Sequence, residues 1–150
     1  STLVESDGLR EQCLACVDAD AEAFGALATA LKVPKDDADP GATAERTRQV
    51  QAALEAAADV PAQVVERSAR IAVLAAGLMG RSNASVASDL DVAMVLAGAA
   101  LEAAAVNVDV NVRYIEDQAI VLRLRSRLDS AREVLAAARA GIPAPVGRTS

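Results

Sequence analysis

Alanine dominates this chain, and aromatic side chains are almost absent from it. Alanine fills 36 of the 150 positions, and the chain has one Phe, one Tyr and no Trp. Alanine is the strongest helix former, whereas strands favour β-branched and aromatic residues. The sequence therefore predicts an all-α fold and excludes most β-sandwich and β-barrel architectures. A chain of this length makes one domain or at most two small ones, and we expect a single domain over residues 1–150.

Apolar spacing and helix-breaking residues predict five helices packed as a bundle or array. Pro34 ends the first helix, and Pro61 suits the first turn of the third. The predicted helices span residues 8–32, 42–59, 61–79, 86–110 and 115–140. In the first helix, apolar residues recur at steps of three and four and form one stripe: Leu14, Val17, Ala21, Phe24, Ala28 and Leu31. Residues 141–150 are expected to form a flexible tail.

The stretch 106–112 alternates valine with polar residues, which is a strand signal. We nevertheless predict a helix there, because no other segment offers a partner strand. A lone strand would leave its backbone groups unpaired.

Charge and residue types exclude several classes of function. The net charge is −6 and the chain contains no histidine, so nucleic-acid binding is not expected and every His-based catalytic or metal site is excluded. Cys13 and Cys16 form a C-x-x-C spacing inside a predicted helix, and we interpret them as thiols lining the core. No targeting or membrane segment stands out, and the longest apolar run spans only residues 92–101. A soluble cytoplasmic protein is expected, without a metal.

Three clusters of polar residues interrupt the apolar pattern, and each is a candidate site. Each also has a plain structural explanation: a solvated acidic turn for the first, helix capping for the second and surface exposure for the third. In chain order the clusters are Asp18, Asp20 and Glu22, with Lys35 beyond them; Asn83, Ser85, Ser88 and Asp89; and Asn107 and Asn111.

Asp89 of the second cluster and Asn107 of the third lie on one face of the predicted fourth helix, and Asn111 follows one turn further on. Asp89 and Asn107 are five full turns apart, or about 27 Å along the helix axis, so one small ligand cannot span them within one chain. Between them runs a flat stripe of small residues: Ala93, Leu96, Ala97, Ala100 and Ala104. This stripe predicts a homodimer packed through the predicted fourth helix, with Asp89 of one copy near Asn107 of the other.

Four motifs in this chain resemble, in order and at similar spacing, motifs of the formiminotransferase-cyclodeaminase / methenyltetrahydrofolate cyclohydrolase family. Residues 18–24 (DADAEAF) resemble D-x-D-A-x-A-F, and residues 33–35 (VPK) resemble L-P-K. Residues 83–89 (NASVASD) resemble N-P-N-x-x-S-D, and residues 107–112 (NVDVNV) resemble N-V-R-I-N-L. The chain differs from these patterns at Ser85 and Asp109, and residues 1–10 do not resemble the family's glycine-rich P-G-G-G-S segment.

The resemblance implies an all-helical dimer that acts on a one-carbon tetrahydrofolate as its substrate. The reaction would be cyclodeamination of 5-formimidoyltetrahydrofolate or hydrolysis of the methenyl bridge. The family's residues carry over as catalytic Asp20, Lys35 and Asp89, and as substrate-binding Asn83, Ser85, Ser88, Asn107 and Asn111. The alternative is a catalytically degenerate relative that binds a small molecule or serves as a dimeric helical scaffold.

The residue types fit this chemistry. Without histidine, carboxylates and lysine must transfer the protons, and Asp20 and Asp89 can accept them. Lys35 can hold a carboxylate of the folate or assist proton transfer. The asparagine amides offer both donors and acceptors, as the edge of a pterin requires.

Overall fold

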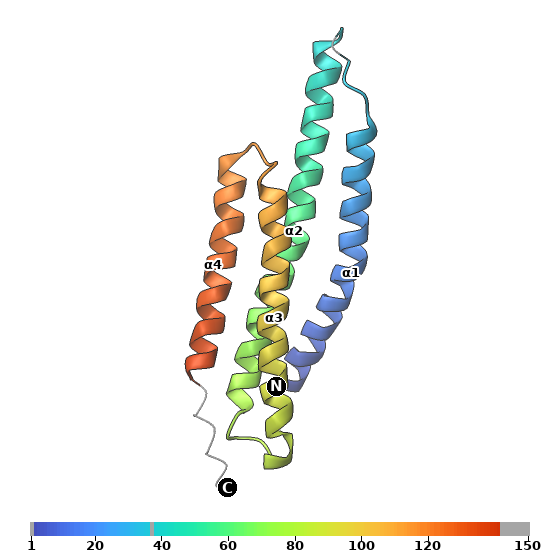
Figure 1. The fold of residues 1–150 in the computed structure, drawn as a ribbon. Coiled ribbons are helices and arrows are strands. Elements are labelled where there is room, and N and C mark those ends of the chain that lie inside the picture. Colours follow the sequence, from blue (N-terminus) through green and yellow to red (C-terminus); the bar gives the residue numbers. More distant parts are fainter. Residues whose placement is uncertain (1, 37, 142–150) are drawn as a thin grey trace.

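Four α-helices make up the computed structural model, which describes residues 2–36 and 38–141 (Figure 1). They are α1 (Thr2–Lys32), α2 (Pro40–Leu78), α3 (Ala87–Val112) and α4 (Gln118–Ala140), and a short 3-10 turn, η1 (Ala84–Val86), precedes α3. The described residues contain no strand, so the all-α prediction is confirmed, and residues 106–112 are helical as expected. The predicted tail lies, apart from Gly141, outside the described residues.

The prediction of five helices is wrong because α2 continues through Pro61. A proline inside a helix has no N–H to donate to the carbonyl four residues before it, which here is Ala57. The side-chain amide of Asn111 supplies the missing donor, with Nδ2 3.1 Å from the carbonyl oxygen of Ala57. The predicted second and third helices are therefore one helix, and the hydrogen bond from Asn111 of α3 stabilises it at Pro61.

The ends of the helices follow the local capping chemistry. Pro34 lies two residues beyond the end of α1, and Asp39 caps α2 by accepting from the amides of Gly41 (2.8 Å) and Ala42 (3.1 Å). Asp117 caps α4 in the same way through the amide of Ala119 (2.8 Å). The first helix begins at Thr2, earlier than the predicted start near residue 8.

Helix α2 is the centre of the bundle and packs against each of the other three helices, while α1 packs on α2 alone (Figure 1). The core combines alanines, which let helix axes approach closely, with a few larger side chains. The largest side chains that are completely buried are Leu101, Leu124, Leu128, Val65 and Val108. The long, small-residue α2 thus holds α1 on one side and α3 and α4 on another.

The apolar stripe of α1 faces away from the bundle. An apolar stripe normally marks the buried face of a helix, yet Phe24 is 71% exposed and Val17 is 67% exposed. The face of α1 that packs on α2 instead carries Leu9, Cys16 and Ala30. Helix α1 has two apolar faces, and the one with smaller side chains at the contact lies against the alanine-rich α2.

Helix α3 also exposes apolar side chains, but its small-residue stripe is not the flat outer surface that we expected. Ala97 and Ala104 are buried in the core of the bundle, whereas Leu96 and Ala100 are exposed. The predicted stripe therefore spans two faces of α3, one buried in the bundle and one exposed. The larger exposed residues lie on the outer side: Val92, Val95, Leu96, Val106 and Val110.

The segment Ala84–Val112 is long and apolar enough, by length and composition, to cross a membrane. This is weak evidence for a span, because the core helix of a soluble protein passes the same test, and 39% of its most apolar window is buried inside the bundle. Its outer face is nonetheless more apolar than a solvated helix needs.

Candidate functional site

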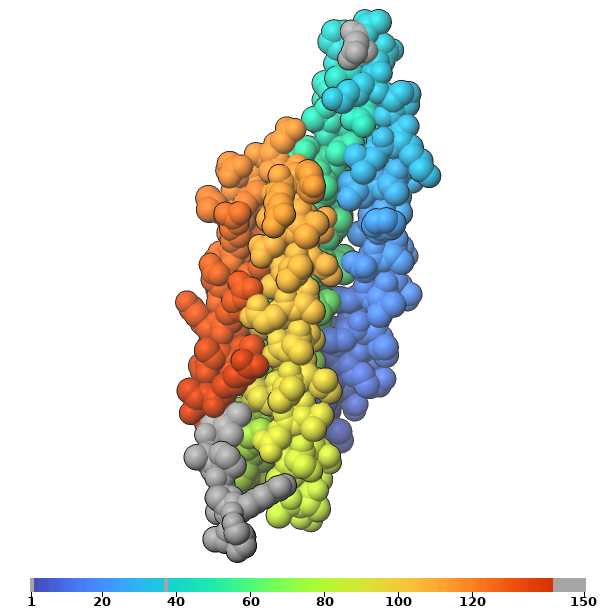
Figure 2. Space-filling view, viewed as in Figure 1, coloured from blue at the N-terminus to red at the C-terminus, as the bar shows by residue number. Residues whose placement is uncertain are grey.

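A cavity of about 260 Å³ lies between α1 and α3, with α2 as its floor. Because α1 and α3 each pack on α2 but not on each other, they leave a furrow, and α2 is visible at its bottom in Figure 2. Its lining comes from all three helices: Cys16 and Asp20 of α1; Val60, Pro61 and Val64 of α2; and Ala100, Ala103, Ala104 and Asn107 of α3.

Two of the predicted site residues, Asp20 and Asn107, meet in this cavity although 87 positions separate them in the sequence. Among the described residues, neither side chain has a hydrogen-bond partner or an ion pair. Both side chains are exposed to solvent, so a carboxylate and an amide line the same cavity without a contact that a ligand would have to break. This combination can accept a proton and can bind a planar heterocycle through both a donor and an acceptor.

Asn111 lies one turn beyond Asn107 but its amide nitrogen is already engaged. Nδ2 donates to the carbonyl of Ala57 and also to the carbonyl of Asn107, at 3.0 Å. The carbonyl of Ala57 is the one that Pro61 leaves without a helical donor, and Pro61 itself lines the cavity. Asn111 therefore fixes the position of the cavity floor relative to α3.

The remaining predicted site residues lie elsewhere in the chain. Asn83 accepts from the amide of Ser85 (3.1 Å) and caps η1, as the capping explanation anticipated. Ser88 and Asp89 are exposed in the first turn of α3, on the same helix as Asn107 but at its opposite end. Lys35 is exposed in the loop between α1 and α2. One chain therefore brings together Asp20 and Asn107 and leaves the others apart.

Cys16 and Pro61 are cavity residues that sequence reasoning did not select. A signal for Cys16 was present, since it lies four positions before Asp20 and so shares a face of the helix with it. Ala103 and Ala100, four and seven positions before Asn107, likewise share a face of α3 with it. No comparable signal identifies Pro61, because its contribution depends on how α2 packs against both neighbours.

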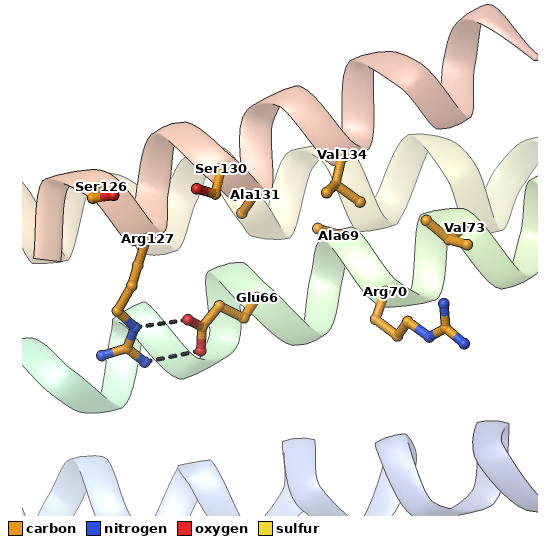
Figure 3. Close-up of a pocket in the computed structure, with 9 residues that line it drawn as sticks. All are labelled: Glu66, Ala69, Arg70, Val73, Ser126, Arg127, Ser130, Ala131 and Val134. Carbon is orange, nitrogen blue, oxygen red and sulfur yellow. Dashed lines mark hydrogen bonds and ion pairs between the residues drawn. The ribbon is translucent and has the colours of Figure 1, made fainter. Parts of the chain in front are cut away.

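A second cavity, of about 490 Å³, lies between α2 and α4 (Figure 3). The guanidinium of Arg127 binds Glu66 through two hydrogen bonds, of 2.7 and 2.9 Å, and donates to Asp59 at 2.5 Å. Hydrogen bonding to Glu66 raises the pKa of Arg127 above its usual range. Burial alone would raise the pKa of Asp59, but hydrogen bonds from Arg127 and Gln63 outweigh it and lower that pKa. The charges in this cavity are paired within the protein.

The described residues offer no group of three or more His, Cys, Asp or Glu side chains that could hold a metal ion. The full sequence has no histidine. The polar side chains that line the α1–α3 cavity are a carboxylate, an amide and a thiol.

Comparison with known proteins identifies the family. The profile of the formiminotransferase-cyclodeaminase family matches residues 1–130. The chain belongs to this family of folate-dependent cyclodeaminases and cyclohydrolases. It is 35% identical over 117 residues to a methenyltetrahydrofolate cyclohydrolase of Methylorubrum extorquens (strain ATCC 14718 / DSM 1338 / JCM 2805 / NCIMB 9133 / AM1). The match covers 78% of this chain and 55% of the relative, so the chain spans about half the length of that relative.

Proposed function

We propose that this chain hydrolyses the methenyl bridge of a one-carbon tetrahydrofolate, as a methenyltetrahydrofolate cyclohydrolase. The observation that carries the proposal is the meeting of Asp20 and Asn107, from two motifs of the family resemblance, in one cavity. The name of the Methylorubrum relative favours this reaction. The tetrahydrofolate is the substrate, and no step needs a metal.

In the proposed reaction, Asp20 acts as the general base. It accepts a proton from a water molecule as the water oxygen attacks the methenyl carbon. One carbon–nitrogen bond of the bridge then breaks, and the freed nitrogen takes the proton from Asp20. The remaining hydroxyl proton leaves to solvent as the carbonyl of the formyl group forms. A positioned carboxylate contributes a rate factor of about 10² to 10⁴ in such a step. The amide of Asn107 binds the edge of the pterin, and Lys35 attracts the carboxylates of the folate's glutamate.

Cyclodeamination of 5-formimidoyltetrahydrofolate is the second candidate, because the matching family profile also carries that name. The two reactions use the same proton-transfer groups but differ in product. Hydrolysis consumes the methenyl absorbance, whereas cyclodeamination creates it and releases ammonia. Assaying the purified protein with each substrate, for both absorbance and ammonia, distinguishes the two. Tight folate binding with neither reaction would instead support a degenerate binding protein.

We further propose that a homodimer completes the site. The apolar side chains that α1 and α3 expose flank the furrow that contains Asp20 and Asn107. A second copy packed across this furrow would cover both apolar faces, and an antiparallel α3 would bring Asp89 of that copy toward Asn107. Exposed apolar surface of this extent is typical of an interaction site.

Mixing two inactive variants tests whether the site is shared between subunits. Asp20→Asn and Asp89→Asn should each lower turnover by about 10² to 10⁴. If the two residues serve the same site from different copies, a mixture that has exchanged subunits should recover about a quarter of the wild-type rate. Half of the randomly paired dimers are then mixed, and one of the two sites in each is intact. A mixture that stays inactive contradicts a shared site.

The dimer surface has its own test. Leu96→Asp places a charge on the exposed face of α3 and should shift the protein to monomer in sedimentation equilibrium. Leu122→Asp is the matched control, because Leu122 is similarly exposed (66% against 63%) but lies on α4, away from the furrow. If both variants sediment like the wild type, this face of α3 is not the interface.

A further inference from the structure

The two cysteines of the C-x-x-C spacing lie in different surroundings. Both are reduced thiols in the middle of α1, and Cys16 is buried while Cys13 is half-buried. Cys16 lines the α1–α3 cavity beside Asp20, whereas Cys13 lines a separate apolar cavity of about 400 Å³ with Leu9 and Ile71. The prediction that both thiols line the core is confirmed for Cys16, which also lines a cavity, but Cys13 is only half-buried.

Arg67 of α2 is the polar partner of Cys16. Its Nη1 lies 2.7 Å from the Sγ of Cys16, and its other hydrogen bonds go to Gln12 Oε1 (3.3 Å) and Gln63 Oε1 (2.8 Å). Both glutamines are neutral, and Arg67 forms no ion pair with a carboxylate among the described residues. A half-buried guanidinium is usually paired with an anion. Of its three hydrogen-bond partners among the described residues, only the sulfur of Cys16 can become an anion.

Cysteines beside a cation are the reactive ones, because the thiolate is the nucleophile and a neighbouring guanidinium stabilises negative charge. The cavity gives a small reagent access to the otherwise buried sulfur of Cys16. Cys13 has no hydrogen bond from Arg67, and burial raises the pKa of its thiol, although the charge of Arg67 partly opposes this rise. The structure therefore places the sulfur of Cys16 beside both a guanidinium and a cavity, and places Cys13 in apolar surroundings.

We propose that Cys16 is a modification site for small disulfides, and that the adduct fills the cavity shared by Asp20 and Asn107. The Cys16 thiol gives up its proton, its sulfur attacks one sulfur of the disulfide, and a new S–S bond forms. The old S–S bond breaks, and the departing thiolate takes up a proton. The exchange needs no other oxidant, and a thiol reductant reverses it by the same steps. A group attached to Cys16 would occupy the space in which Asp20 faces Asn107.

The chain has two cysteines, so each single variant reports on one thiol. The probe is methyl methanethiosulfonate, which adds a methylthio group and releases methanesulfinate, followed by mass spectrometry of the intact protein. Cys13→Ser, which keeps Cys16, should gain one methylthio group at least about tenfold faster than Cys16→Ser, as expected for a thiol beside a cation. The same measurement in denaturant should give equal rates for both variants, which attributes the difference to the fold.

Arg67→Gln in the Cys13→Ser background should slow the labelling about tenfold. Arg70→Gln in the same background is the matched control, because Arg70 lies on the same helix but pairs with Glu5 and not with Cys16. Equal labelling of the two single-cysteine variants, or a rate that Arg67→Gln leaves unchanged, overturns the proposal.

The effect on turnover rests on the proposed function, whereas the labelling does not. Methylthio-labelled Cys13→Ser should lose the folate turnover of unlabelled Cys13→Ser and regain it with dithiothreitol, while labelling should leave the turnover of Cys16→Ser at that variant's own unlabelled rate. Full turnover in labelled Cys13→Ser would show that the adduct does not block the site. If the unlabelled protein has no turnover with either folate, the proposed function fails, and the labelling rates still decide whether Cys16 is the modification site.

Discussion

The two cavities that flank α2 differ in how their polar groups are satisfied. In the larger, α2–α4 cavity, Arg127 holds Glu66 and Asp59 in hydrogen bonds, so a charged ligand would have to displace contacts that already exist. In the smaller, α1–α3 cavity, Asp20 and Asn107 face open space without a partner among the described residues. Asp20 and Asn107 are exposed to solvent, so a ligand that binds them displaces water and breaks no contact within the protein.

The strongest test of which cavity is the functional site is to remove one carboxylate from each. Asp20→Asn should lower turnover by about 10² to 10⁴ because it removes the proposed general base. Glu66→Gln should leave turnover within about twofold, since Glu66 serves only the ion pairs of the other cavity. Steady-state rates of both variants, with melting temperatures to confirm folding, measure the difference. A large loss in Glu66→Gln and none in Asp20→Asn would exchange the roles of the two cavities.

The second prediction separates two asparagines on neighbouring turns of α3. Asn111→Ala leaves the carbonyl of Ala57 without a donor and should lower the free energy of unfolding by about 1–2 kcal/mol. In a Pro61→Ala background the helix can supply its own N–H to that carbonyl, so the effect of Asn111→Ala should fall by at least half. Urea denaturation of the four proteins gives the coupling. Additive effects would show that Asn111 does not compensate for Pro61.

Asn107→Ala is the matched control for that cycle. Its side chain makes no hydrogen bond to another described residue, so the free energy of unfolding should change by less than about 0.5 kcal/mol. KM for the folate should rise instead, because Asn107 lines the proposed substrate cavity. A stability loss as large as that of Asn111→Ala would mean that the two asparagines have the same role.

The fold class and three of the four helices could be predicted from local sequence, because alanine content and helix-ending residues act over a few positions. Helix α2 could not, since the partner that lets it continue through Pro61 is 50 residues away at Asn111. The face of α1 that packs against α2 could not be predicted for a related reason. Periodicity shows that a face is apolar, but a helix with two apolar faces does not reveal which one meets its neighbour.

The candidate site was only partly predictable in the same sense. The motifs that resemble the family identified Asp20 and Asn107, and the packing of α1 and α3 on α2 brings them into one cavity. Spacing along one helix showed that Asp89 and Asn107 are too far apart to share a ligand within one chain. The ion pairs of Arg127 were missed entirely, because pairing between helices depends on which faces meet.

The third prediction concerns the paired charges of the larger cavity. Arg127→Met keeps most of the aliphatic packing but leaves Glu66 and Asp59 without their cation. Because these carboxylates are partly exposed and can be hydrated, the free energy of unfolding should fall by only about 1 kcal/mol. Urea denaturation at neutral pH measures it. Arg123→Met, which removes the more exposed pair with Glu55, should have a smaller effect, and the reverse order would contradict this view of the cavity.

The smallest expected effect is the contribution of Asp59 to the pH dependence of the free energy of unfolding. The hydrogen bonds from Arg127 and Gln63 lower its pKa in the folded protein despite burial, so the folded state favours the ionised carboxylate more than the unfolded state does. The stability that Asp59 adds is therefore complete above the usual aspartate pKa of about 3.9, and it is lost as pH falls through that value and below.

Asp59→Asn removes this titration and provides the test. Since the Asp59 side chain is 41% exposed, solvent screening should limit the effect to a few tenths of a kcal/mol. Between pH 6 and pH 3 the free energy of unfolding should fall slightly less in Asp59→Asn than in the wild type. If the free energy of unfolding falls as steeply in Asp59→Asn as in the wild type, the pairing of Asp59 with Arg127 adds no stability that depends on pH, and the paired charges of the larger cavity do not act as proposed here.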